Sequence, residues 1–278
     1  MALVAHKPAR LAPGSPAHRR MKRIWVHARQ VVLPLAVLLL LAAVWEASVR
    51  LLNVPEFILP APSQIWVASA ASGSLMLDHT LATFNTTMLG FLLSVAVSLP
   101  LAVAITASPL VANAIYPLLV LTQSIPKVAL APILVVAIGA GETSRVLVAF
   151  LVAFFPLVIS TATGLLAVPP ELIELARSYK ATRLQEIFRI RLPYAVPFVF
   201  SGLKLSITFA VIGAVVGEFV AADKGLGYQI LSATAFFKTS LAFGAVVILS
   251  VLGIALFQSV VIAERIFFPW SAEEERNP

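Results

Sequence analysis

Long apolar segments are the feature that most constrains how this chain can fold. Six runs of about twenty residues each match the length at which an α-helix crosses a hydrocarbon core about 30 Å thick. They cover residues 31–51, 84–106, 112–138, 146–166, 194–217 and 242–263. Lipid offers the backbone no hydrogen-bond partners, which favours helices, and the runs lack the polar–apolar alternation of a β-barrel. The sequence therefore predicts an all-α, polytopic membrane protein with six transmembrane helices.

The composition supports lipid as the main solvent and excludes several kinds of site. Hydrophobic residues make up 60% of the 278 residues and charged residues only 12%, about half of what soluble domains carry. The chain has no cysteine, and His6, His18, His27 and His79 show no metal-ligand spacing, so no metal site and no cofactor is predicted. The net charge of +7 could suggest nucleic acid. No basic patch with interleaved aromatic residues lies outside the membrane-flanking loops, so no nucleic-acid partner is predicted.

The distribution of basic residues predicts the topology. Residues 1–30 carry seven lysine or arginine side chains and no acid, the segment 167–193 carries five, and residues 52–83 carry none. Because basic residues are retained on the cytoplasmic side, the first two segments are expected there, and six spans return the C-terminus to the same side. We therefore expect a cytoplasmic basic tail at 1–30, a membrane domain at 31–266 and a cytoplasmic C-terminal tail at 267–278.

The third apolar run is interrupted. Gln123, Ser124, Pro126 and Lys127 lie in its middle, where a proline removes a backbone donor and clashes with the preceding turn. A broken, charged span is tolerated where it faces protein or a water-filled path. These four residues are therefore candidates for a translocation path, and Glu218, just after the fifth run, is a further candidate. Lys127 could instead reach a membrane interface, and Glu218 could instead be a helix-packing residue.

The segment 167–193 is predicted to form two short helices at the membrane surface. Pro170 suits the first turn of a helix, and Glu174 then lies near the positive N-terminal end of that helix. Thr182 can cap a second helix. Pro193 is expected to end the second helix before the fifth span begins.

Five residues of this segment lie at a characteristic spacing from one another. They are Glu174, Ala176, Ile190, Leu192 and Pro193. In these positions the segment resembles the EAA loop of binding-protein-dependent ABC importer permeases, whose pattern is Glu-Ala-Ala, three residues, Gly, about nine residues and Ile-x-Leu-Pro. Leu175 replaces the first Ala and Lys180 replaces the Gly. A lysine forced to positive φ in that turn would cost about 1–2 kcal/mol.

The resemblance extends over most of the chain. The matching segments are Leu-Pro-x-Pro-Ser at 59–63, Gly-Phe at 90–91, Gly-Glu-Phe at 217–219 and Gly-Leu-Gly at 225–227. They are similar to permeases of the nitrate, sulfonate and taurine branch. The segment 123–132 is most similar to permeases for riboflavin or thiamine-pyrimidine precursors. The resemblance thus favours riboflavin or a pyrimidine-type precursor as the solute and leaves sulfonate, taurine and nitrate open.

The resemblance also implies that separate subunits carry out different parts of transport. Such permeases form a path in the cell (inner) membrane as a dimer of two permease copies, a separate ABC ATPase docks on the cytoplasmic loop, and a periplasmic or lipid-anchored protein delivers the substrate. The chain has no Gly-x-x-x-x-Gly-Lys-Ser/Thr phosphate loop, so we expect it to be no enzyme itself. Within the coupling loop 171–192 and at its end, the implied ATPase-coupling residues are Glu174, Ala176, Arg177, Lys180, Ala181, Ile190, Leu192 and Pro193.

Two other classes of membrane protein compete with this interpretation. An ion-coupled secondary transporter usually has ten or more spans and acidic residues near the bilayer midplane, and the six runs contain no such acid. A membrane-embedded enzyme needs His, Asp or Glu clustered at one interface, and the sequence offers no such cluster.

Overall fold

The architecture is entirely helical. A computed structural model describes residues 16–274, and that part of the chain contains no strand. The predicted all-α class is therefore confirmed, whereas residues 1–15 and 275–278 of the predicted tails lie outside the described residues. The chain divides into two compact units, Met1–Gln64 and Ile65–Pro278.

The first unit is dominated by one long helix. Helix α1 spans Pro16–Leu51, and its stretch Val32–Leu51 is apolar enough to cross a membrane, in agreement with the predicted first span. Residues 16–30, predicted as part of a tail, are helical and continue directly into this span.

An acidic residue at the end of the first span fixes the turn that follows. Ser63 donates its backbone N–H to Glu46 Oε2 at 3.0 Å and its hydroxyl to Glu46 Oε1 at 2.8 Å. Arg50 donates to the same Glu46 Oε1 at 2.6 Å. Ser63 ends the Leu-Pro-x-Pro-Ser segment and lies in the first turn of α2 (Pro62–Ala71), so Glu46 caps that helix.

The second unit is built around three helices that approach one another closely. Its long helices are α3 (Gly73–Thr106), α6 (Glu142–Leu166), α9 (Leu192–Ala221) and α11 (Thr239–Phe267), and α6 packs between α3 and α9. A Cβ atom built on Gly90 would lie 2.5 Å from Ala149 Cβ, and one on Gly213 would lie 2.6 Å from Ala149 Cα. Small residues thus let α3 and α9 approach α6 at one level, as is typical of helix packing in membranes.

Serine side chains connect the same three helices. Ser94 and Ser98 of α3 donate to the α6 carbonyl oxygens of Phe150 and Phe154, at 3.1 and 3.2 Å. Ser206 of α9 donates to the carbonyl oxygen of Ala153 at 2.9 Å. These bonds give the buried serine hydroxyls acceptors on the neighbouring helix. Lipid would offer them no hydrogen-bond partner.

The third apolar run is broken, as predicted. Helix α4 (Pro109–Thr122) is followed by a 3₁₀ turn at Lys127–Leu130 and by α5 (Ala131–Ile138), and the two halves are bent by 80°. The structure has five helices long and apolar enough to cross a membrane among the described residues, or six if the bent pair is one span.

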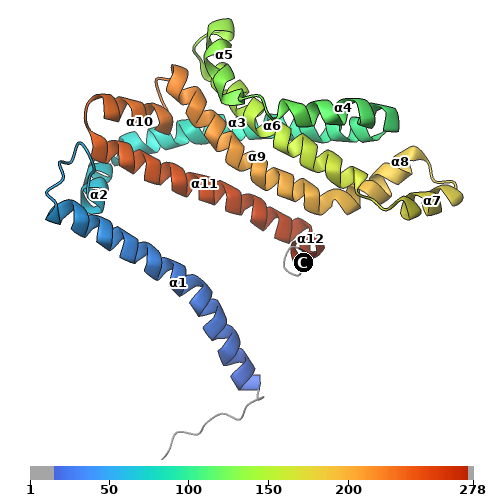
Figure 1. The fold of residues 1–278 in the computed structure, drawn as a ribbon, viewed down its shortest axis with the longest axis horizontal. Helices are drawn as coiled ribbons and strands as arrows, with labels where there is room; N and C mark the ends of the chain where they lie inside the picture. Colours follow the sequence, from blue (N-terminus) through green and yellow to red (C-terminus); the bar gives the residue numbers. More distant parts are fainter. Residues whose placement is uncertain (1–15, 275–278) are drawn as a thin grey trace, which may run out of the picture. The chain divides into compact units, whose positions relative to one another are not determined.

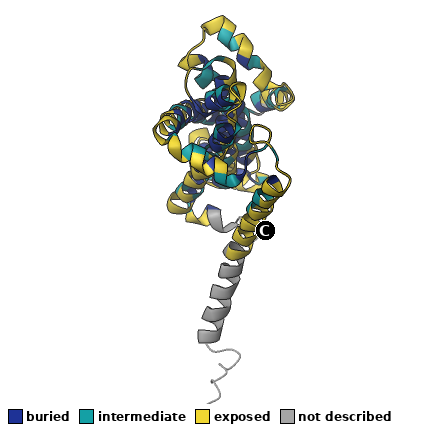
Figure 2. Ribbon diagram, turned by 90° about the vertical axis from the view of Figure 1, so that its left-hand side faces the viewer, coloured by how far each residue is buried: buried dark blue, intermediate teal, exposed yellow. Residues whose placement is uncertain are grey.

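Short helices lie at the two ends of the long ones (Figure 1). Helices α7 (Pro170–Ser178) and α8 (Arg183–Glu186) lie at one end of α6 and α9, and α10 (Leu226–Ala235) lies at the other. A final helix, α12 (Pro269–Glu274), follows α11. Figure 2 shows buried residues gathered in the middle of this unit and exposed residues around them. Many exposed side chains are large and apolar, such as Val136 at 88% and Ile254 at 63%, so this surface requires lipid or a partner.

Candidate coupling site and translocation path

Helix α7 ends in a tight turn that contains the unusual lysine. The helix begins at Pro170, as predicted, and closes with bonds from Lys180 N–H to Arg177 O (2.9 Å) and from Ala181 N–H to Ala176 O (3.0 Å). This pair of bonds is a Schellman motif, which needs a left-handed residue after the helix. Lys180 takes that conformation with φ +58°. The turn expected for glycine is therefore formed by a lysine, at a conformational cost of about 1–2 kcal/mol.

The second helix begins with a capping box. Thr182 Oγ1 accepts the N–H of Gln185 at 3.3 Å, and Gln185 Oε1 accepts the N–H of Thr182 at 2.8 Å. The predicted role of Thr182 as a cap is confirmed, and Gln185 completes the box.

The prediction that Pro193 ends this helix is wrong. After α8 the chain forms a π-helical turn, η2 (Ile187–Arg191), in which Leu192 N–H bonds to Ile187 O, and it continues directly into α9. Pro193 lies in the first turn of α9, where the widened turn removes the need for a donor on its nitrogen. The surface helix and the fifth span are thus one continuous helical element.

One buried carboxylate holds the two short helices together. Glu186 is 7% exposed, and its Oε2 lies 3.2 Å from Arg177 of α7 while its Oε1 lies 2.7 Å from Arg191 of η2. Arg191 also donates to the carbonyl oxygen of Leu165, near the end of α6, at 2.9 Å. Sequence reasoning missed this role, although Glu186 is the only acid among five basic residues between positions 177 and 191.

The coupling segment Pro170–Arg191 presents apolar side chains outward. Leu184 is 67% exposed and Phe188 61%, and Leu172 and Leu175 are exposed as well. Among the predicted coupling residues, Glu174, Arg177, Lys180 and Pro193 are exposed, and Ala176, Ala181, Ile190 and Leu192 are half-buried. The segment therefore combines a rigid interior with an apolar outer surface.

Two of the predicted path residues line a small cavity. Gln123 and Lys127 enclose about 290 Å³ together with Phe155, Pro156, Ile159, Ser160, Leu205 and Phe209. Lys127 Nζ donates to Gln123 O at 3.1 Å and lies 4.6 Å from the centroid of the Phe155 ring. Ser124 and Pro126 are exposed at the bend of the broken span but do not line this cavity.

Glu218 lies away from this cavity, in the packed end of the second unit that carries α10. It is 2% exposed, and it accepts hydrogen bonds from Thr83 Oγ1 at 2.8 Å and from Gly227 N–H at 2.7 Å. Leu226 N–H donates to Thr83 Oγ1 at 2.7 Å. These contacts fix the start of α10 against α3 and α9, which favours the helix-packing interpretation of Glu218. No cluster of three or more metal-ligating side chains occurs within the described residues.

Residues 94–271, more than half of the chain, match the family model of the binding-protein-dependent transport system inner membrane component. The chain belongs to this family. It is therefore the permease component of a binding-protein-dependent ABC importer, a multi-pass inner-membrane protein without ATPase activity of its own. The match includes the broken span, the coupling segment and α9. The predicted family, fold class and membrane location are confirmed.

Curated relatives of the permease resemble it over most of its length. The riboflavin transport system permease protein RibX of Chloroflexus aurantiacus is 38% identical over 239 residues, covering 84% of this chain and 88% of the relative. The formylaminopyrimidine transport permease protein ThiX of Halalkalibacterium halodurans is 35% identical, covering 88% and 98%. The taurine transport system permease protein TauC of Escherichia coli is 29% identical, covering 92% and 95%.

A solved structure supports the fold of the permease. A chain of the MetNI methionine ABC transporter in an inward-facing conformation aligns with a TM-score of 0.55 at 19% identity. The alignment covers 68% of this chain and 98% of that chain. At this identity the likeness concerns the fold alone, and it confirms the predicted ABC importer permease architecture.

Proposed function

We propose that this permease passes a planar flavin- or pyrimidine-type solute across the membrane and is driven by an ATPase that docks on the coupling segment. The observation that carries the proposal is the exposed apolar surface of Leu172, Leu175, Leu184 and Phe188 on a segment held rigid by Glu186. A soluble subunit that closes on ATP can move the spans only through an element rigid enough to transmit the motion. Because η2 joins the segment to α9 without a break, a displacement of α8 moves the fifth span with it.

The solute class is supported by the cavity around Lys127 and by the relatives. Phe155 and Phe209 offer aromatic surface for a flat ring, and the Lys127 ammonium and Gln123 amide offer donors for ring carbonyl oxygens. A volume of about 290 Å³ is close to the lower end of the range of about 300–1,000 Å³ for small-molecule sites. Two relatives are named as transport permeases for riboflavin and for formylaminopyrimidine, and both compounds carry such rings.

The proposed assembly contains two copies of the permease and two ATPase subunits. Each chain carries one coupling segment, so a pair of nucleotide-binding subunits needs two segments. The mass of the detergent-purified complex tests this assembly, and a single permease copy or a second, different permease chain would contradict it.

Uptake in cells that express the permease with its ATPase and binding protein tests the solute and the energy source. We expect uptake of labelled riboflavin or of a pyrimidine precursor, inhibition by vanadate, and no competition from taurine, sulfonates or nitrate. Uptake that survives vanadate but is lost with a protonophore would instead favour an ion-coupled transporter.

A further inference from the structure

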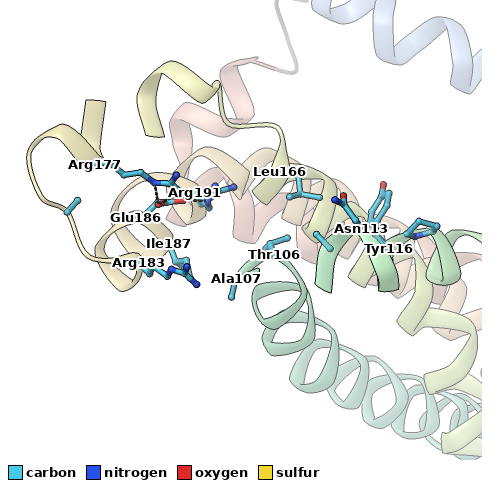
Figure 3. A pocket seen from close by; sticks show the side chains of 13 residues that line it. Thr106, Ala107, Asn113, Tyr116, Leu166, Arg177, Arg183, Glu186, Ile187 and Arg191 are labelled. Atoms are coloured by element: carbon cyan, nitrogen blue, oxygen red, sulfur yellow. Dashed lines mark hydrogen bonds and ion pairs between the residues drawn. The ribbon is translucent and has the colours of Figure 1, made fainter. Parts of the chain in front are cut away.

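A second cavity lies beside the coupling segment (Figure 3). It encloses about 570 Å³ between the segment, the end of α3 and residues 112–117 of α4. Arg177, Arg183 and Arg191 line its side on the segment, and Thr106, Asn113 and Tyr116 line the side on α3 and α4. Of the predicted coupling residues, Arg177 and Ala181 line the cavity. The proposed coupling function uses the outer surface of the segment and does not account for a cavity on its other side.

The charge in this cavity is not balanced. Three arginines and one acid, Glu186, line it, which leaves two positive charges in excess. Arg177 and Arg191 share the carboxylate of Glu186. Arg183 forms no ion pair within the part of the chain that the structure describes. Concentrated positive charge in a concave site attracts anions, because low-dielectric walls focus the field.

The polar groups of the cavity suit a phosphate group. Guanidinium groups match phosphate oxygens with paired N–H donors. Arg177 and Arg191 already donate to Glu186, and Arg191 donates to the carbonyl oxygen of Leu165 as well, so the guanidinium that offers paired donors to a phosphate is that of Arg183. The Asn113 amide lies across the cavity and can add a further donor. The Tyr116 hydroxyl is held 2.9 Å from Thr163 Oγ1, so it lies at a fixed place in the opposite wall.

The depth of the cavity is that of a membrane interface. Thr106 is the last residue of α3 and Leu166 is the last residue of α6, so the cavity lies where two apolar spans end. Basic pockets between transmembrane helices at this level bind the head groups of anionic lipids. Ala112, Pro117 and Ile187 make part of the wall apolar, which suits the first carbons attached to such a head group.

We propose that this cavity binds an anionic phosphate group, from a phospholipid head group in the adjacent leaflet or from a small phosphorylated solute. The bound phosphate would bridge Arg183 of the coupling segment and Asn113 of α4. It would thereby connect the broken span to the segment that moves with α9. This role does not depend on which solute the permease transports.

Binding to the detergent-solubilised full chain tests the proposal. One arm titrates short-chain phosphatidylglycerol, with phosphatidylcholine as the control, and counts adducts by native mass spectrometry. The other arm titrates inorganic phosphate and follows the thermal midpoint. We expect saturable binding in at least one arm, and the arm that responds identifies the source of the phosphate.

Substitutions locate the binding. Arg183→Gln is expected to weaken binding about tenfold through loss of one charge-assisted contact. Arg189→Gln is the matched control, because Arg189 is an exposed arginine of η2 that does not line the cavity. Asn113→Leu is expected to weaken binding less than Arg183→Gln. Equal weakening by Arg183→Gln and Arg189→Gln, or no saturable binding in either arm, would overturn the proposal.

Discussion

The Arg191 guanidinium donates two hydrogen bonds, of 2.7 and 2.9 Å, to a single carboxylate oxygen of Glu186. The other carboxylate oxygen accepts from Arg177, so one buried acid connects both short helices of the coupling segment. This contact is the internal support of the segment on which the proposed ATPase contact depends.

Replacing Glu186 with alanine should loosen the coupling segment. The change leaves Arg191 partly buried without its partner carboxylate, which costs about 3–5 kcal/mol for a buried pair. Hydrogen–deuterium exchange of the peptides covering 170–191 should rise strongly, while peptides from α3 remain protected. Glu171→Ala removes an exposed acid of the same segment and serves as the control. Unchanged exchange in Glu186→Ala would show that the ion pairs do not hold the segment.

Replacing Lys180 with glycine should stabilise the permease. Lys180 has φ +58°, and glycine adopts that conformation without steric cost. We expect the free energy of unfolding to rise by about 1 kcal/mol, seen as a higher thermal midpoint. Lys180→Ala keeps the Cβ atom and should give no comparable gain. If both variants gain equally, the effect comes from removing the charge and not from the backbone.

Reversing the charge of Glu174 should abolish ATP-driven uptake while the permease still inserts in the membrane. Glu174 is exposed on α7, the helix that also presents Leu172 and Leu175, so a lysine there reverses a charge on the segment that the proposed docking uses. The loss of docking free energy should be about 2–5 kcal/mol, measured as loss of co-purified ATPase. Glu142→Lys makes the same charge change at an exposed acid at the opposite end of α6 and should retain more uptake. Normal uptake with bound ATPase in Glu174→Lys would remove the main support for the coupling function.

Position 127 should be reachable from water. The chain has no cysteine, so Lys127→Cys is labelled without background by a charged thiol reagent. We expect labelling in membranes, because the cavity at Lys127 contains the ammonium group and the Gln123 amide. Ile254→Cys, on an exposed apolar face of α11, should remain unlabelled in lipid. Absence of labelling at 127 in every nucleotide state would exclude this cavity from the path.

A methyl group at Gly213 should disturb the packing of α6 and α9. The added Cβ would lie 2.6 Å from Ala149 Cα, a backbone atom that cannot move alone. We expect Gly213→Ala to cost about 1–3 kcal/mol by overpacking, seen as a lower thermal midpoint. Gly253→Ala on α11 is the control, since nothing lies within 4 Å of its Cβ. Equal midpoints for the two variants would contradict the close approach.

Local chemistry explains which parts of this structure were predictable. The break near Pro126, the start of α7 at Pro170 and the cap at Thr182 each depend on neighbouring residues, so the sequence predicts them. No local sequence pattern indicates the π turn before Pro193. The prediction that α8 ends at Pro193 was therefore wrong.

Contacts between residues distant in sequence account for what was missed. Thr83 and Glu218 are 135 positions apart, and no periodicity relates them. Lys204 lies within the fifth apolar run and received no role, yet it lies 2.8 Å from Glu264, an acid buried near the end of α11. Such pairs follow from the packing of α9 against α3 and α11, which a single sequence does not specify.

The π turn at Ile187–Arg191 also sets the direction in which the side chains of α8 point relative to those of α9. An α-helix advances about 100° per residue, so one extra residue in a turn changes the azimuth of every side chain before it relative to those after it. Leu184 lies before the turn, and Ala195, which packs in the core, lies after it. The direction in which Leu184 leaves the helix is therefore fixed by a single inserted residue, and shortening the turn would point the outer surface of α8 elsewhere while leaving the membrane core of the permease in register.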